Sequence, residues 1–175
     1  MDKKTVAIFG TSKAKPGDEV FQLAYETSRY VAEAGFDIIN GGYSGIMLAS
    51  ARAANLAGGK ITGVTCDAFG RSEPNEFITD RINTSCLDER LDTLLENADA
   101  YIVLPGSTGT LLELAKIWEL KNKHFLQADK PIILIGSFWK PLIDIIVAVD
   151  ADSAKSLTVV GTPEQAAEYL VKKLK

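Results

Sequence analysis

The 175-residue sequence is poor in the residues that build metal centres, disulfide frameworks and membrane spans. It contains a single histidine, His124, which excludes His–His metal sites and the usual hydrolytic triads. Its two cysteines, Cys66 and Cys86, form no CxxC pair, so we expect reduced thiols. The apolar stretches are far shorter than a membrane span, and residues 1–4 leave no room for a signal sequence. We therefore expect a cytoplasmic protein with no membrane partner and no metal.

Charge and known nucleotide motifs exclude further classes. The net charge of −4 and the pI of about 5.1 argue against a nucleic-acid polymer as partner, although backbone amides can still bind a single nucleotide. No GxGxxG follows the first apolar run, which disfavours a dinucleotide dehydrogenase. No GxxxxGK[ST] occurs, which disfavours a P-loop enzyme. The length and the 46% hydrophobic content fit one globular domain over residues 1–175.

Strand and helix patterns alternate along the whole chain. Apolar runs predict strands at 5–9, 36–39, 61–65, 82–84, 100–104, 131–135 and 157–160. Periodic patterns predict helices at 18–34, 46–57, 87–97, 111–121 and 138–149, and Thr162 to Gln165 has the pattern of a helix start. Residues 66–78 are expected to form a surface loop. Continuous apolar strands between helices indicate a doubly wound, Rossmann-like α/β fold, with a parallel sheet covered by helices on both faces.

The segment from Leu104 to Glu113 is the most informative part of the sequence. It joins an apolar strand to a helical pattern through the turn PGSTGT. A glycine-rich turn before a helix directs backbone N–H groups and the positive end of the helix dipole toward one point, where a phosphate binds well. Glu113 is expected to face the same cavity. Because a carboxylate beside an anion site is electrostatically unfavourable, we interpret Glu113 as an acid/base residue.

Three turns have the small-residue composition expected beyond the carboxyl ends of parallel strands, where ligands bind in this fold class. They lie at 10–12, 41–45 and 106–110. The sequence therefore predicts a nucleotide site with its phosphate at the third turn. The candidate binding residues are Gly10, Thr11, Ser12, Gly41, Gly42, Ser44, Gly45, Met47, Pro105, Gly106, Ser107, Thr108, Gly109 and Thr110.

Several segments resemble the LOG ("lonely guy") family over most of the chain, from Val6 to about Asp144. Residues 105–113 are similar to the family motif PGGxGTxxE, and residues 41–47 resemble its GGGxxGLM turn. Residues 88–90 resemble its HERK segment and place Arg90 at the family arginine. Several matching segments in the right order are more specific than one glycine-rich loop.

The resemblance implies a phosphoribohydrolase that cleaves AMP or a cytokinin riboside 5′-monophosphate into base and ribose 5-phosphate. Glu113 would stabilise an oxocarbenium-like ribose and act as general base on water. Arg90 would bind phosphate or ribose hydroxyls and keep Glu113 ionised. Met47 would pack near the base. The resemblance implies no cofactor, and it implies a homodimer, with contacts made by the helices at 46–57 and 87–97 together with Trp118.

The sequence departs from the family motif at two informative positions. Ser107 replaces the second motif glycine, and Leu91 replaces the lysine that follows the family arginine. These changes favour an alternative, a non-catalytic protein that carries a nucleotide or a phosphorylated cofactor, as molybdenum cofactor carriers of similar fold do. A pyridoxal-dependent decarboxylase is disfavoured because no lysine stands in a recognisable cofactor setting.

Overall fold

The computed structural model describes residues 3–70, 73–126 and 130–175. Its strands are β1 (Thr5–Phe9), β2 (Asp37–Asn40), β3 (Ile61–Cys66), β4 (Asp80–Thr84), β5 (Ala100–Val103), β6 (Ile132–Ile135) and β7 (Thr158–Val160). Its α-helices are α1 (Glu19–Glu33), α2 (Ile46–Leu56), α3 (Leu87–Glu96), α4 (Thr108–Asn122), α5 (Lys140–Val147) and α6 (Pro163–Leu174). Two short 3₁₀ helices, η1 (Asp67–Phe69) and η2 (Ser153–Ser156), complete the described elements.

The seven strands form one parallel sheet in the order β4-β3-β2-β1-β5-β6-β7. The chain starts at β1, winds outward to β4, and then returns to the other side of β1 with β5. The winding direction therefore reverses between β1 and β5, and doubly wound folds open their ligand crevice at such a point. The expected Rossmann-like fold with a parallel sheet is confirmed.

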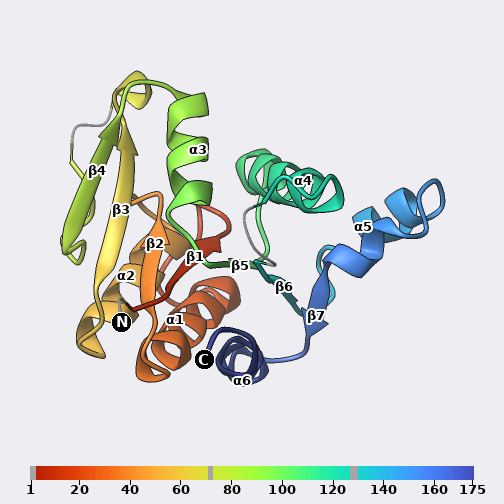
Figure 1. The fold of residues 1–175 in the computed structure, drawn as a ribbon. Coiled ribbons are helices and arrows are strands. Elements are labelled where there is room, and N and C mark those ends of the chain that lie inside the picture. The colour runs from red at the N-terminus through yellow and green to blue at the C-terminus, as the bar shows by residue number, and fades with distance from the viewer. Residues whose placement is uncertain (1–2, 71–72, 127–129) are drawn as a thin grey trace.

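Helices cover both faces of the sheet (Figure 1). α1, α2 and α6 pack on one face around a core that includes Val31, Ile38 and Leu170. α3 and α4 pack on the other face, where Leu94, Leu114 and Tyr101 are buried. The central strands β1 and β5 are apolar on both sides because both faces are covered. This rigid centre supports the turns that follow both strands.

Most element boundaries agree with the sequence pattern, and the differences have local causes. α4 begins at Thr108 rather than at 111. The sequence pattern placed the start too late because the first turn of the helix carries small residues and shows no apolar period. Both 3₁₀ helices escaped prediction, since a single turn has no periodicity to detect, and η1 lies within the expected loop at 66–78. The helix start at Thr162 is confirmed: the Thr162 hydroxyl accepts a hydrogen bond from the Gln165 N–H.

Three stretches outside the predicted strands and helices, 1–4, the expected loop at 66–78 and 122–130, lie partly outside the described residues. Within the described part of the chain, no helix is long and apolar enough to cross a membrane.

Candidate active site

The ends of β1 and β5 bring two of the three predicted turns together. The backbone N–H of Thr11 donates to the Pro105 carbonyl at 3.1 Å, and the Thr11 carbonyl accepts from the Ile46 N–H at 3.0 Å. Backbone hydrogen bonds therefore link the turn after β1 both to the start of α2 and to the turn after β5. A Cβ on Gly10 would lie 2.9 Å from the Ile46 side chain, so glycine allows this close packing.

The N-terminus of α4 forms one rim of the resulting cavity. Ser107 is the N-cap residue in extended backbone, with φ of −103°, so a side chain at this position causes no strain. The backbone N–H groups of residues 108–110 have no carbonyl partner within the helix, because the first such hydrogen bond runs from the Leu111 N–H to the Ser107 carbonyl. These groups remain available to a ligand. Thr108 to Thr110 were expected in a loop but form the first helical turn. A Cβ on Gly109 would meet no atom within 4 Å, so this rim is open.

The turn at 41–45 forms the next wall. Gly42 and Gly45 have positive φ angles of 77° and 68°. A Cβ on Gly45 would lie 2.4 Å from the backbone of Ser12, so only glycine fits there. Two asparagines fix the turn: Asn40 accepts from the Gly42 N–H at 2.8 Å, and Asn75 donates to the Tyr43 carbonyl at 2.9 Å.

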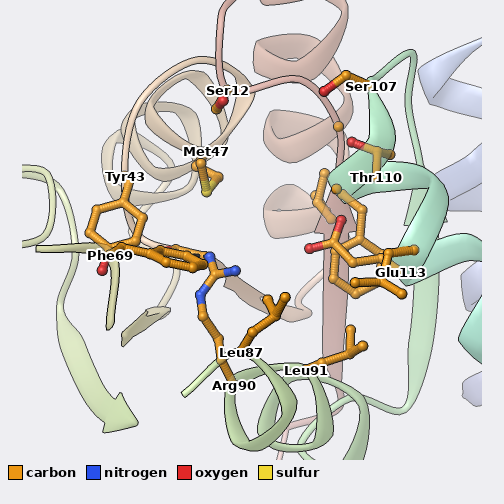
Figure 2. A pocket seen from close by; sticks show the side chains of 16 residues that line it. Ser12, Tyr43, Met47, Phe69, Leu87, Arg90, Leu91, Ser107, Thr110 and Glu113 are labelled. Carbon is orange, nitrogen blue, oxygen red and sulfur yellow. Dashed lines mark hydrogen bonds between the residues drawn. The ribbon is translucent and has the colours of Figure 1, made fainter. Parts of the chain in front are cut away.

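Arg90 projects from α3 toward the centre of the cavity and is only 8% exposed (Figure 2). Its Nε donates to the Val64 carbonyl at 2.8 Å, and its Nη2 donates to the Gly41 carbonyl at 3.2 Å. The guanidinium lies over the rings of Tyr43 and Phe69, with 5.7 and 5.2 Å from Cζ to the ring centroids. Burial lowers the pKa of Arg90, and the nearby Glu113 carboxyl opposes that shift. A guanidinium remains positively charged under such conditions.

Glu113 projects from α4 on the opposite side of the cavity (Figure 2). Its side chain forms no ion pair and no hydrogen bond with another described residue. Desolvation by burial raises the pKa of Glu113 to about 8, and the charge of Arg90 only partly offsets this effect. Arg90 therefore acts on the pKa of Glu113 in the expected direction, but burial has the larger effect, and the ionised state of Glu113 stays a prediction. The desolvation of a carboxyl in an apolar wall outweighs the attraction of a cation across the cavity.

These walls enclose a cavity of about 490 Å³, a size typical of small-molecule sites. Nine of the predicted site residues line it: Gly10, Ser12, Gly41, Met47, Arg90, Ser107, Gly109, Thr110 and Glu113. The other predicted residues lie in or next to the same three turns but are not part of the lining: Thr11, Gly42, Ser44, Gly45, Pro105, Gly106 and Thr108. Among these, Ser44 donates its hydroxyl to the Ser12 carbonyl at 3.1 Å. Gly106 lies so close to the Thr110 side chain that a Cβ would be 2.1 Å away.

Seven apolar residues that line the cavity were not among the predicted site residues: Ile8, Phe9, Tyr43, Phe69, Leu87, Leu91 and Leu112. Tyr43 lies within the predicted turn at 41–45 but was not a candidate site residue, and Phe69 lies in the stretch interpreted as a surface loop. Asn40 carried a usable signal, because a polar residue that ends an apolar strand just before two glycines is suited to anchor a turn. No local pattern marks Phe69. Among the described residues, no group of three or more potential metal ligands comes together.

The fold and the site define a class: a doubly wound α/β protein with a helix N-terminus, an arginine and a glutamate in its switch-point crevice. Comparisons then give the family. The family model described as "SLOG cluster4 family" matches residues 3–167, and the chain belongs to that family. The resemblance to LOG proteins is thereby confirmed.

Named relatives support the same assignment. The chain is 32% identical over 133 residues to the cytokinin riboside 5′-monophosphate phosphoribohydrolase of Mycobacterium tuberculosis, covering 75% of this chain and 70% of the relative. The solved structure of TM1055 is 25% identical, with a TM-score of 0.77 over 97% of this chain and 99% of that one. The molybdenum cofactor binding protein of Rippkaea orientalis shares the fold, with a TM-score of 0.81 at 20% identity over 100% of this chain and 99% of that one.

Proposed function

We propose that this protein is a phosphoribohydrolase that cleaves the N-glycosidic bond of a nucleoside 5′-monophosphate, AMP or a cytokinin riboside monophosphate. The products are the free base and ribose 5-phosphate. One observation carries the proposal: a single cavity combines the open N-terminus of α4, the buried Arg90 and the partly buried Glu113. These are the groups needed for a phosphate, a permanent positive charge and an acid/base residue.

The substrate phosphate binds at the rim formed by Ser107, Gly109 and Thr110. The unpaired N–H groups of the first helical turn donate to its oxygens, and the helix dipole adds a favourable field. The Ser107 hydroxyl, which makes no capping hydrogen bond, can donate as well. The ribose then extends toward Glu113 and Arg90, on the two sides of the cavity.

In the reaction, water attacks C1′ of the ribose as the bond from C1′ to the base nitrogen breaks. The electron pair of that bond leaves with the base, and the base takes up one proton, which balances the proton removed from the attacking water. Glu113 accepts a proton from the attacking water, and its negative charge stabilises the oxocarbenium-like ribose. This role requires the ionised carboxylate, whereas the pKa of about 8 keeps much of Glu113 protonated at pH 7. The rate should therefore rise with pH.

The relatives support this reaction class. The phosphoribohydrolase of Mycobacterium tuberculosis and that of Rhodococcoides fascians match this chain at 32% and 28% identity. Both matches cover at least 75% of the chain, and α3 and α4, which carry Arg90 and Glu113, lie in its central part. The choice of base is part of the proposal, and the experiment below addresses it.

The proposal is tested by product analysis with AMP, GMP, CMP and N6-isopentenyl-AMP. The parent protein should release free base and ribose 5-phosphate from at least one substrate. Glu113→Gln and Arg90→Lys should abolish or strongly reduce that release. Glu119→Gln, on the exposed side of the same helix, and Arg52→Ala, exposed on α2, are matched controls that should retain activity. Equal activity in Glu113→Gln and Glu119→Gln would contradict the assigned role of Glu113.

A second candidate is a protein that binds a nucleotide or a phosphorylated cofactor without cleaving it. Two features favour it: the apolar Leu91 lines the cavity where the family has a lysine, and burial raises the pKa of Glu113 to about 8. The structural likeness to a molybdenum cofactor binding protein is compatible with this function. Thermal stabilisation by AMP without release of base under any condition would favour the carrier.

We also propose that the protein acts in the cytoplasm as a homodimer. The expected contribution of Trp118 is not supported, because that side chain is 5% exposed and its Nε1 donates to the Ser153 carbonyl at 2.9 Å. Exposed apolar side chains lie on the expected helices, where Leu56 of α2 and Leu87 of α3 are 65% and 42% exposed, and also on and beside α5, where Ile145 and Val149 are 66% and 92% exposed. Light scattering should give a mass of two chains, and a mass of one chain would overturn the dimer.

A further inference from the structure

Phe69 is the aromatic residue among three apolar residues that line the cavity and are each 42% exposed, the others being Leu87 and Leu112. It has this exposure although large apolar side chains are mostly buried in this protein, and the cavity also holds Arg90 and Glu113. It belongs to η1, which follows directly after β3. An exposed aromatic ring inside a ligand cavity marks a surface that a ligand can cover.

The surroundings of Phe69 hold its ring in place. The guanidinium of Arg90 lies 5.2 Å from the Phe69 ring centroid, and two backbone carbonyls fix that guanidinium. The ring of Tyr43 lies 6.2 Å away at an angle of 49°, and the Tyr43 hydroxyl accepts a hydrogen bond from the Cys66 N–H at 2.8 Å. A ring supported by a fixed cation and a fixed aromatic neighbour loses little entropy when a ligand binds on it.

The position of Phe69 relative to the phosphate rim is informative. Figure 2 shows Phe69, Tyr43 and Met47 on one side of the cavity, with Ser107, Thr110 and Glu113 on the other. The first group is aromatic or apolar, whereas the second offers hydroxyls, a carboxyl and the N-terminus of α4. A ligand that spans the cavity must therefore present an anion at one end and a flat apolar surface at the other.

We propose that Phe69 is the stacking platform for the heteroaromatic ring of the ligand and determines the preference of the site for large flat rings. This inference rests on the proposed function and identifies the subsite for the base. Stacking on an aromatic side chain needs no particular hydrogen-bond pattern, since every base has a π-face. Affinity should therefore follow ring area, with purine nucleotides bound more tightly than pyrimidine nucleotides. A ligand without a base should gain nothing from Phe69.

The test compares equilibrium binding of AMP, CMP and ribose 5-phosphate by calorimetry. Ribose 5-phosphate carries no base and is not cleaved, so its binding can be measured directly. AMP and CMP are titrated into proteins that carry Glu113→Gln, so that neither nucleotide is cleaved during the measurement. Phe69→Leu keeps an apolar side chain but removes the ring, Phe69→Ala removes both, and Phe69→Trp enlarges the ring. Phe138→Leu is the matched control, because Phe138 is 53% exposed and lies outside the cavity lining.

Stacking predicts that Phe69→Leu and Phe69→Ala weaken AMP binding by roughly 5- to 100-fold. Ribose 5-phosphate should bind within about twofold of the parent in both variants, since its phosphate subsite is untouched. Phe69→Trp should retain or increase AMP affinity, and Phe138→Leu should leave the affinity for both ligands unchanged. Unchanged thermal unfolding of Phe69→Leu checks that the fold persists.

Three results would overturn the inference, and they differ in whether the proposed function also fails. If Phe69→Leu weakens AMP and ribose 5-phosphate equally, Phe69 only supports Arg90, and nucleotide binding stands. If the Glu113→Gln protein with Phe69 unchanged binds AMP no more tightly than ribose 5-phosphate, the cavity has no base subsite at Phe69. If it binds neither ligand, both the stacking platform and the proposed function fail.

Discussion

The two sides of the cavity are built in different ways. The rim at the start of α4, where we propose that the phosphate binds, comes from consecutive residues, 107–110, and offers backbone N–H groups and a helix dipole. The opposite wall joins Gly41, Tyr43, Phe69 and Arg90 from three separate segments, and it relies on side-chain packing. The rim therefore depends on local conformation, whereas the wall depends on long-range contacts. Substitutions on the two sides should accordingly affect ligand binding and stability in different proportions.

Glu113 faces the wall from the α4 side, and its replacement should have the largest effect. We expect Glu113→Gln to lower kcat by about 100- to 10,000-fold, the range typical for loss of an acid/base group. In the parent, kcat/KM should rise with pH through about 8, because ionisation of Glu113 supplies the base. The pH profile of base release measures both. A rate that falls above pH 8 would instead make Glu113 a general acid.

Gly41→Ala should damage the side-chain wall. The added Cβ would lie 1.8 Å from Arg90 Nη2 and 2.6 Å from Met47 Sδ, so Arg90 must move away from its two carbonyl partners. We expect a loss of about 1–3 kcal/mol in the free energy of unfolding, together with a loss of activity. Chemical denaturation and product analysis check the two effects. Full stability in this variant would show that the wall is adaptable.

Glu113→Gln should also stabilise the fold at alkaline pH. Because burial raises the folded-state pKa from 4.5 to about 8, the contribution of the carboxyl to stability is complete below pH 4.5 and lost as the pH rises through 8. Glutamine stays neutral, so at pH 9 the variant should be more stable by about 1–3 kcal/mol, a range discounted for partial exposure. At pH 4 the two proteins should unfold alike. A pH series of urea melts provides the comparison.

Gly109→Ala is the counterpart of Gly41→Ala on the phosphate rim. Its Cβ would meet no protein atom within 4 Å, and alanine is the better helix former, so stability should rise by about 0.5 kcal/mol. The methyl group would occupy the open rim, and we expect ribose 5-phosphate to bind about tenfold more weakly. Thermal melts measure the expected gain in stability, and calorimetry measures the expected loss of affinity. Unchanged binding would place the phosphate elsewhere in the cavity.

Ser107→Gly, which restores the family motif, should have the smallest effect. Ser107 has a φ of −103° and makes no capping hydrogen bond, so its replacement relieves no strain and removes no cap. We expect stability within about 0.5 kcal/mol of the parent, as for ordinary surface changes. Nucleotide affinity should change by less than about threefold, since glycine loses only one hydroxyl donor. A larger loss of affinity would give the Ser107 hydroxyl a direct role in binding.

The glycine-rich turn before α4 and the fold were predictable from sequence because their signals are local. Alternating apolar runs and helical periods identified every strand and α-helix of the described sheet and its layers, and PGSTGT marked the start of α4 within three residues. Phe69 was not predicted because it belongs to no apolar period, and its partners, Tyr43 and Arg90, lie more than 20 positions away on either side. No local pattern encodes such a contact.

The sequence by itself determined the α/β class, the parallel sheet, the glycine-rich turns and the likeness to LOG proteins. These depend on side-chain periodicity and backbone freedom, which act between near neighbours. Only the tertiary structure decided that Arg90 lies over two aromatic rings and that Glu113 stands apart from it with a raised pKa. Both depend on burial and on distances across the cavity, and these arise only when segments far apart in the chain pack together.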